Sequence, residues 1–200
     1  MSPPAQRLCV YCGSSPGLNP AYMAAARLLG TAMAQAGLGL VYGGGSIGLM
    51  GETARAVLAA GGHVTGIIPE FLVSKERMQE GVQELIVTRT MHERKMAMFE
   101  RSTGFVALPG GIGTLEELAE ILTWSQLKQH ARPVVLCNVA GFWDGLVGLI
   151  EHMTSEGFIR TGFELQLDVA DGAENIIPVY EARRAKTRDV VGLEIMQDKL

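Results

Sequence analysis

The chain has 200 residues, of which 48% are hydrophobic and 19% charged, a composition typical of one soluble globular domain with a sizeable core. Its formal net charge of -4 and its lack of a Lys/Arg-rich segment exclude a surface for a nucleic acid polymer, although a mononucleotide needs only one or two cations. Neither a secretory signal nor an apolar run of the roughly 20 residues that a membrane helix needs is recognisable. Three cysteines, an odd number, argue against a disulfide framework and favour the reducing cytoplasm.

Short apolar segments alternate with longer segments of helical periodicity along most of the chain. We expect strands at Arg7–Gly13, Leu38–Gly43, His63–Ile68, Glu84–Thr88, Thr103–Leu108 and Pro133–Asn138. We expect helices at Pro20–Ala36, Ile47–Ala60, His92–Arg101, Thr114–Gln129 and Gly145–Ser155. This alternation predicts an α/β fold, a doubly wound, Rossmann-like three-layer sandwich with a mostly parallel sheet of about six or seven strands.

The C-terminal part of the chain is less regular. A further strand is expected at Leu165–Val169 and a helix near Glu174–Arg183. Residues 185–200 are charged and only weakly periodic, so we expect a C-terminal appendage or tail there. Residues 1–184 are then a single Rossmann-like domain, because no linker or internal repeat divides them.

Ligands of such sheets bind beyond the carboxyl ends of the strands, so the loops at those ends carry the candidate site. The first loop, 12–17, offers small hydroxyl donors, among them Ser14. Cys9 and Cys12 form a C-x-x-C pair, but along a strand these positions face opposite sides, and Cys137 cannot complete a zinc site. The four histidines show no ligand spacing either, so no metal site is expected.

The second loop contains a literal G-x-G-x-x-G at residues 43–48. The match is weak evidence for a dinucleotide, because it follows the second predicted strand rather than the first and no suitable acidic ribose ligand follows. A P-loop is excluded because no Gly-Lys-Ser/Thr is present. We interpret the segment as a loop that faces a phosphate or a ribose through Gly43, Gly44 and Ser46.

The helix that begins near His92 carries two adjacent cations, Arg94 and Lys95, in its first turn. Cations are disfavoured there by the helix dipole, so an anionic ligand is one explanation for them. A salt bridge to Glu93 or simple solvation is the alternative.

The last glycine-rich turn, residues 109–117, follows an apolar strand and opens an amphipathic helix. Its glycines let the backbone approach a ligand, and the helix start favours a phosphate or a carboxylate. A structural explanation also exists, in which Thr114 caps the helix and Glu117 completes a capping box. Capping alone explains the adjacent carboxylates Glu116 and Glu117 less well.

The three motifs 43–51, 92–95 and 109–117, taken together and in this order, closely resemble the LONELY GUY (LOG) family of cytokinin-activating phosphoribohydrolases, long mislabelled as lysine decarboxylases. The resemblance spans roughly Leu8 to Arg160, and the hallmark P-G-G-x-G-T-x-x-E is matched without a departure. It implies an enzyme that cleaves a prenylated adenine ribotide to the free base and ribose 5-phosphate, without a cofactor. Family members are commonly homodimers, with active sites near the subunit interface.

By the same resemblance, Arg94 and Glu117 are the catalytic residues. Further family contacts with substrate fall on Lys95, Thr123 and, in a less similar segment, Glu76. The residues of the glycine-rich turn that are expected to contact the nucleotide monophosphate are Gly110, Gly111, Ile112, Gly113, Thr114, Leu115 and Glu116.

The chemistry of these residues fits the implied reaction. Cleavage of an N-glycosidic bond passes through an oxocarbenium-like ribose, which a carboxylate such as Glu117 can stabilise while water attacks. Arg94 is expected to orient the phosphate or to assist the departing base, and the amides of residues 110–114 are expected to hold the phosphate.

Three other functions share some of these features. A nucleotide- or molybdopterin-like cofactor carrier has the glycine turns but does not need both Arg94 and Glu117. A lysine decarboxylase needs a pyridoxal Schiff-base lysine, and none of Lys75, Lys95 and Lys128 lies in a matching motif. A nicotinamide dehydrogenase rests on the weak match at residues 43–48 alone.

Overall fold

A computed structural model of the chain describes residues 4–74, 78–160, 162 and 164–197, with side chains as far as residue 187. In this part of the chain, one sheet of seven parallel strands runs in the order β4-β3-β2-β1-β5-β6-β7. The strands are β1 (Arg7–Tyr11), β2 (Gly39–Tyr42), β3 (Val64–Pro69), β4 (Glu84–Thr88), β5 (Gly104–Ala107), β6 (Val134–Cys137) and β7 (Asp168–Ala170). This sheet confirms the predicted doubly wound α/β fold.

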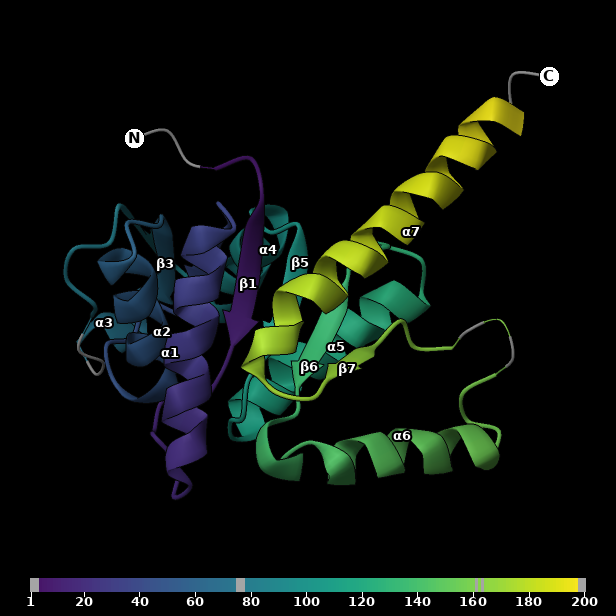
Figure 1. The fold of residues 1–200 in the computed structure, drawn as a ribbon, viewed down its shortest axis with the longest axis horizontal. Helices are drawn as coiled ribbons and strands as arrows, with labels where there is room; N and C mark the ends of the chain where they lie inside the picture. The colour runs from purple at the N-terminus through teal and green to yellow at the C-terminus, as the bar shows by residue number, and fades with distance from the viewer. Residues whose placement is uncertain (1–3, 75–77, 161, 163, 198–200) are drawn as a thin grey trace.

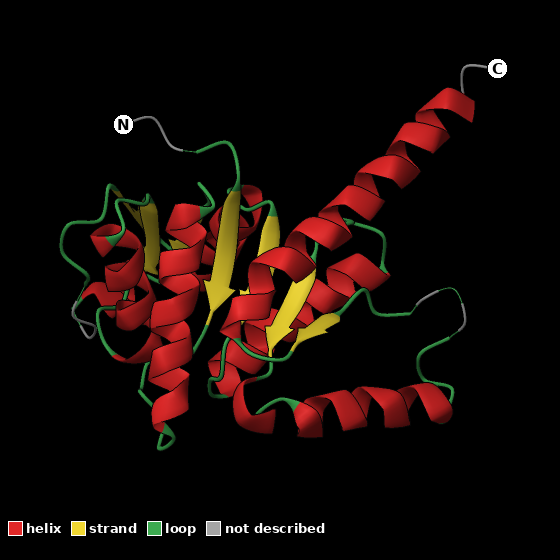
Figure 2. Cartoon of the chain, in the orientation of Figure 1, coloured by secondary structure: helices red, strands yellow, loops and turns green. Residues whose placement is uncertain are grey.

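Helices cover both faces of the sheet, which gives the predicted three layers (Figure 1, Figure 2). The longer helices are α1 (Pro20–Gln35), α2 (Gly48–Ala59), α4 (Met91–Glu100), α5 (Ile112–Gln126), α6 (Asp144–Ser155) and α7 (Ile176–Gln197). The short elements are α3 (Glu70–Val73) and the 3-10 turns η1 (Val139–Gly141) and η2 (Ala173–Asn175). Helices α1, α2 and α7 pack on one face, and α4, α5 and α6 pack on the other.

The central strands bury residues on both faces, as strands of a parallel sheet do. In β1, Leu8 and Val10 join the core under α1 and α2, whereas Cys9 and Tyr11 join the core under α4 and α5. The alternation follows from the two-residue period of a strand. It also confirms that Cys9 and Cys12 lie on opposite faces, since Cys12 belongs to the first core.

The C-terminal part differs most from the predicted elements. Strand β7 is shorter and begins three residues later than expected, at Asp168. Helix α7 begins at Ile176 and continues through residue 197, so residues 185–197, expected as an appendage or tail, prolong the helix that was expected near Glu174–Arg183. Its outer turns extend away from the body of the molecule, which explains why the weak periodicity of this segment did not indicate a helix (Figure 1). In the described part of the chain, no helix is both long and apolar enough to cross a membrane.

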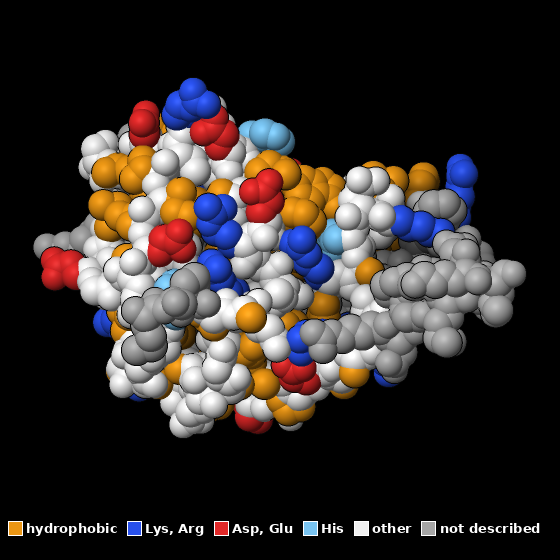
Figure 3. Space-filling model, turned by 90° about the horizontal axis from the view of Figure 1, so that it is seen from above, with side chains coloured by type: hydrophobic (Ala, Val, Ile, Leu, Met, Phe, Trp, Pro, Cys, Tyr) orange, Lys and Arg blue, Asp and Glu red, His pale blue; other side chains and the backbone are white. Residues whose placement is uncertain are grey.

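The strand order reverses direction between β1 and β5, which are neighbours in the sheet. Helices α1 and α5, which follow these strands, lie on opposite faces. In a sheet of this topology the two connecting loops diverge at the carboxyl edge, and the crevice between them is the expected ligand site. The opposite, amino-terminal edge is the face seen in Figure 3, where Lys and Arg side chains are interspersed with Asp and Glu. The loops after β1 and β5 are therefore the expected place for a ligand.

Candidate active site

Three loops meet at the crevice and are tied together through their backbones. The amide of Gly13, after β1, donates to the carbonyl of Pro109, after β5, at 3.0 Å. The carbonyl of the same Gly13 accepts from the amide of Leu49 at 3.1 Å, which attaches the loop after β2. A Cβ on Gly48 would collide with the backbone of residues 14 and 15, so only glycine permits this contact. The structure thus brings the three predicted glycine-rich segments together, with Ser14 exposed beside them.

The turn after β5 presents the start of α5 to the crevice. The helix begins at Ile112 with Gly111 as its N-cap, and no side chain caps it. The predicted capping box is therefore wrong: Thr114 lies inside the first turn and is buried, because the chain turns helical earlier than expected. A Cβ on Gly111 or Gly113 would meet no atom of the described chain within 4 Å. Neither residue has a positive φ, so backbone geometry and packing do not require glycine there, and the free space suits a ligand.

Arg94 projects from the first turn of α4 toward the same crevice. Its Nε donates to the carbonyl of Ile67 near the end of β3 at 3.1 Å, and its Nη1 lies 3.4 Å from the sulfur of Met91. Nη1 also lies 3.2 Å from Oε1 of Glu117, and both side chains of this pair are almost buried, at 11% and 13% exposure. The structure therefore joins the two expected catalytic residues in one ion pair.

Helix α4 is set in place by its N-cap. The hydroxyl of Thr90 accepts from the amide of Glu93 at 3.1 Å, and the carboxylate of Glu93 accepts from the amide of Arg89 at 3.0 Å. Glu93 pairs with Arg89 rather than with Arg94 or Lys95, so the local salt bridge offered as the ordinary explanation for these cations is absent from the ion pairs among described residues. Both cations instead reach across to α5.

The carboxyl group of Glu117 has a raised pKa. Burial is the main cause, and the negative charge of Glu116 adds to it, while the positive charges of Arg94 and Lys95 act in the opposite direction. A carboxylate whose pKa is shifted toward neutrality can accept a proton from water and release it again. Buried titratable groups of this kind at the mouth of a crevice are typical of catalytic sites.

Lys95 forms a second link between α4 and α5. Its Nζ lies 2.8 Å from Glu116 and 3.0 Å from Glu120, and these carboxylates raise the pKa of its ammonium group. Thr123 lies one turn beyond Glu120 on the same face of α5, and its hydroxyl donates to the carbonyl of Ala119. Glu116, Glu120 and Thr123 thus share one face of α5, and Lys95 of α4 pairs with the first two.

The loop after β2 approaches Arg94 directly. A Cβ on Gly43 would collide with Nη2 of Arg94, so the absence of a side chain admits the guanidinium. Gly44 has a φ of +83°, and its carbonyl accepts from the amide of Gln79 at 3.2 Å. Ser46 follows, half-buried, in the same loop. Glu76, the remaining expected contact, lies outside the described residues.

Sequence patterns did not indicate three groups that hold this site together. The carbonyl of Ile67 and the sulfur of Met91 orient Arg94, and neither has a sequence signature. Glu120 pairs with Lys95, and its position four residues after Glu116 could have indicated this. Among the described residues, no group of three or more His, Cys, Asp or Glu side chains could hold a metal ion.

The sequence of the chain is similar to sequences of known proteins. A family described as "Possible lysine decarboxylase" matches residues 50–179. The cytokinin riboside 5'-monophosphate phosphoribohydrolase LOG of Oryza sativa subsp. japonica is 50% identical, covering 88% of this chain and 76% of its own. LOG2 of Arabidopsis thaliana, with the same enzyme name, is 43% identical, covering 93% of this chain and 87% of its own.

Solved structures with the same fold are more distant in sequence. The Moco carrier protein of Chlamydomonas reinhardtii matches with a TM-score of 0.67 at 24% identity, covering 90% of this chain and 98% of its own. The molybdenum cofactor binding protein of Rippkaea orientalis matches with a TM-score of 0.66 at 24% identity, covering 91% and 98%. At this identity, the likeness establishes the fold and nothing about the ligand.

Proposed function

The chain belongs to the LOG family of cytokinin riboside 5'-monophosphate phosphoribohydrolases, and we propose that it hydrolyses the N-glycosidic bond of a purine nucleoside 5'-monophosphate. The products are the free base, of the N6-modified adenine type, and ribose 5-phosphate. The observation that carries the proposal is the buried ion pair of Arg94 and Glu117 beside an open glycine turn. A carrier would need the turn but not this pair.

The start of α5 is the proposed site for the phosphate. The first amides of a helix have no partner within the helix, and the dipole adds partial positive charge. Gly111 and Gly113 leave that end open, and Lys95 lies on the adjacent face. The phosphate is then bound by backbone amides and one cation, which requires no metal ion.

Glu117 is the proposed catalytic carboxylate. As the bond between C1′ and the base nitrogen breaks, the base leaves with the electron pair and takes up a proton from solvent, and the ribose becomes oxocarbenium-like. The negative charge of Glu117 stabilises this ribose. Its carboxylate accepts a proton from the attacking water, whose oxygen forms the new bond to C1′, and then releases that proton to solvent. Arg94, fixed by Ile67 and Met91, holds the carboxylate in position and is the proposed contact for phosphate or departing base.

The geometry of Lys95 argues against a lysine decarboxylase. A Schiff-base lysine must be available as a neutral amine, which requires a lowered pKa. Lys95 is instead held between two carboxylates that raise its pKa. The family description "Possible lysine decarboxylase" is therefore not supported by the lysine at this site.

The decisive experiment is a panel of nucleoside monophosphates and their nucleosides, with released base identified by chromatography. We expect base release from adenosine 5'-monophosphate or an N6-prenylated analogue, and little from the nucleosides, because the phosphate site at α5 would be empty. Equal turnover of adenosine and its monophosphate would contradict the phosphate assignment.

Replacing Glu117 by Gln tests the catalytic assignment. Glu117→Gln keeps the size and most of the polarity of the side chain but removes the charge, so kcat should fall by about 10²- to 10⁴-fold while the nucleotide Kd changes little. If binding and base release were lost together, Glu117 would be structural.

A homodimer and a cytoplasmic location complete the proposal. A second copy could cover three exposed apolar side chains, which are Phe71 in α3 and Leu85 and Val87 on edge strand β4. The three cysteines are all free and buried, which fits a reducing compartment. Sedimentation velocity tests the dimer, and a single species of 21.4 kDa at micromolar concentration would contradict it.

A further inference from the structure

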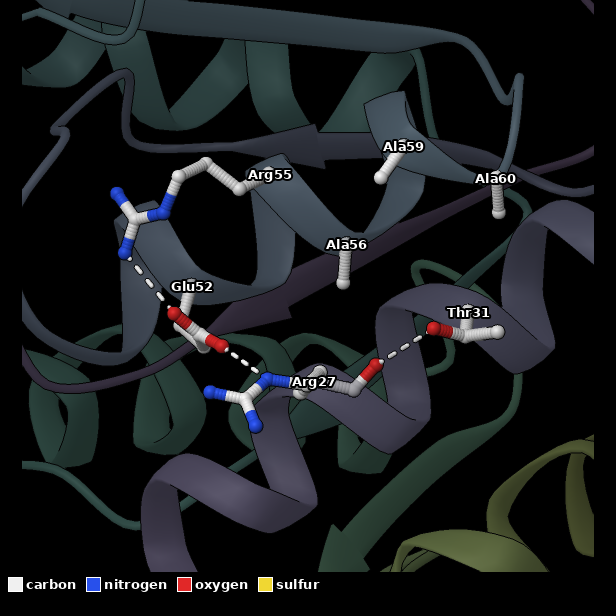
Figure 4. A pocket seen from close by; sticks show the side chains of 7 residues that line it. All are labelled: Arg27, Thr31, Glu52, Arg55, Ala56, Ala59 and Ala60. Carbon is white, nitrogen blue, oxygen red and sulfur yellow. Dashed lines mark hydrogen bonds and ion pairs between the residues drawn. The ribbon is translucent and has the colours of Figure 1, made fainter.

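Two arginines share one carboxylate at the junction of α1 and α2, outside the site described so far. Glu52 accepts from Nε of Arg27 at 2.6 Å and from Nη2 of Arg55 at 3.0 Å. Glu52 and the two arginines line a cavity of about 370 Å³. Its lining also includes Ala56, Ala59 and Ala60, whose small side chains leave the space open (Figure 4). Glu52 is almost buried, with its side chain 12% exposed, while the two arginines reach toward solvent.

The two arginines differ in what else they contact. Besides Glu52, Arg55 donates through Nη1 to the carbonyl of Ser46 at 2.9 Å and to Oε1 of Gln79 at 3.4 Å. The Arg27 side chain, among the described residues, donates to Glu52 and not to Ser46 or Gln79, and Figure 4 shows its guanidinium beneath Glu52, on α1. Arg55 alone of this pair therefore connects the cavity to the loop after β2.

The loop is shaped to receive this contact. Gly51, one turn into α2, lies so close to the carbonyl of Ser46 that a Cβ there would collide with it. Without that Cβ, the Ser46 carbonyl turns over the helix toward Arg55. Gln79 is the other acceptor. Its backbone amide donates to the carbonyl of Gly44, beside an antiparallel bridge between Gly45 and Met78. One guanidinium thus holds both the loop and the segment at 78–79 that runs alongside it.

From these contacts we infer that Arg55 is a positioning residue for nucleotide binding, fixing the loop 43–48 against the crevice with Glu52 as its anchor. The inference rests on the proposed function, because it takes the loop as the wall that faces ribose or phosphate. Arg55 holds the loop at Ser46, whereas Arg94 approaches it at Gly43, so Arg55 is assigned a positioning role rather than a contact with the nucleotide. A hydrogen bond from a charged donor is among the stronger ones in proteins, and here it restrains a glycine-rich segment that has little stiffness of its own.

Catalysis itself should depend little on Arg55. Arg94 is held by Ile67 on β3 and Glu117 on α5, whereas the hydrogen bonds of the Arg55 side chain to described residues go to Ser46, Gln79 and Glu52. Loosening the loop then weakens binding of ground state and transition state alike, which raises KM and leaves kcat largely unchanged.

The test compares Arg55→Met with Arg27→Met. Methionine keeps much of the apolar stem of either arginine but none of its donors, and the two variants each remove one partner of Glu52. We expect Arg55→Met to raise KM for the nucleotide roughly tenfold with kcat within about threefold, while Arg27→Met changes neither by more than about twofold. Arg55→Lys, which retains the charge and one donor group, should recover part of the loss. Thermal melting of each variant confirms that it is folded.

A second readout separates this inference from the proposed activity. In the Glu117→Gln background, the Kd of adenosine 5'-monophosphate is measured by calorimetry with and without Arg55→Met, and we expect the same roughly tenfold weakening. A wild-type protein that binds but never releases base would overturn the activity and leave the positioning role standing. An unchanged Kd and KM in Arg55→Met, an equal rise in Arg27→Met, or a fall confined to kcat would each overturn the positioning role.

Discussion

At the scale of single residues, the site is controlled by the balance of charge around one buried carboxylate. Glu117 is desolvated, faces Arg94, and has Glu116, Glu120 and Lys95 nearby on two helices. Burial and the neighbouring carboxylates raise its pKa, whereas the two cations lower it. The net direction is upward, so these neighbours set the pH at which the proposed catalytic charge appears.

The pH dependence of activity follows from this shift. If the ionised form of Glu117 is the active one, kcat/KM falls as the pH drops through its raised pKa, so the acid limb lies above the ordinary value of 4.5. Glu116→Gln removes a charge that raises this pKa and should move the limb to lower pH. Lys95→Met removes a charge that lowers it and should move the limb to higher pH. The measurement is the pH profile of kcat/KM.

The position of the limb, rather than the size of kcat/KM, carries this test, because both residues are also proposed to contact substrate. Glu151→Gln in α6 serves as a control of the same chemistry, because Glu151 is exposed and is not among the main charges that shift the pKa of Glu117, and it should leave the limb in place. Movement of the limb in the same direction in both site variants would contradict the assignment of the limb to Glu117.

At the scale of elements, the site depends on how closely the loops after β1 and β2 approach each other. Gly48 has a φ of +61° and its α-carbon faces the backbone of residues 14 and 15 with no room for a Cβ. Gly61, at the end of α2, has a similar φ of +76° but nothing within 4 Å of where a Cβ would lie. Substitutions at these two glycines therefore separate the effect of backbone strain from the effect of close approach between the loops.

Alanine at these two glycines should have different consequences. Gly61→Ala pays only for the left-handed conformation, about 1–2 kcal/mol in the free energy of unfolding, and should bind nucleotide normally. Gly48→Ala adds the overlap with the neighbouring loop, about 1–3 kcal/mol more, and should raise KM because the two loops must separate. Denaturant unfolding and steady-state kinetics on both variants measure this, and equal effects would show that the loop contact is unimportant.

The elements also show what a sequence can and cannot predict here. The strands and the longer helices of the first 155 residues were predictable because parallel strands are continuous apolar runs and these helices are amphipathic, whereas the four-residue α3 is too short to show a helical period. The start of α5 was not, because Thr114 has the chemistry of a cap and only the geometry of Gly111 moves the helix start earlier. The support of Arg94 by the Ile67 carbonyl was also unpredictable, because any residue at position 67 supplies a carbonyl.

At the scale of the whole molecule, the sheet acts as a rigid frame that brings distant segments to one edge. Four loops or helix starts supply the residues that meet there, which are residues 13, 48, 94, 109 and 117. They meet because all the described strands run parallel, so that the carboxyl ends of the strands lie at one edge. Helix α7 belongs to this frame at its beginning, where Ile176 and Tyr180 are fully buried and the Tyr180 hydroxyl lies 2.9 Å from that of Thr103. Farther along, it extends away from the sheet (Figure 1).

This division of α7 predicts where the fold ends. Arg183 pairs with Asp168 of β7 at 2.6 Å, and among the side chains described as far as residue 187 it is the last of α7 to form an ion pair or hydrogen bond with the sheet or its connecting loops. A chain ending at Thr187 should therefore unfold within about 1 kcal/mol of the full chain and retain its kcat/KM, because no proposed site residue lies beyond 123. Tyr180→Ala, by contrast, should cost about 3–5 kcal/mol, since it empties a buried aromatic position packed on Gly104. Denaturant titration of both proteins decides the matter. A shortened chain that loses several kcal/mol would place the outer turns of α7 in a stabilising contact, and sedimentation of that same protein would then tell whether the contact is with a second copy.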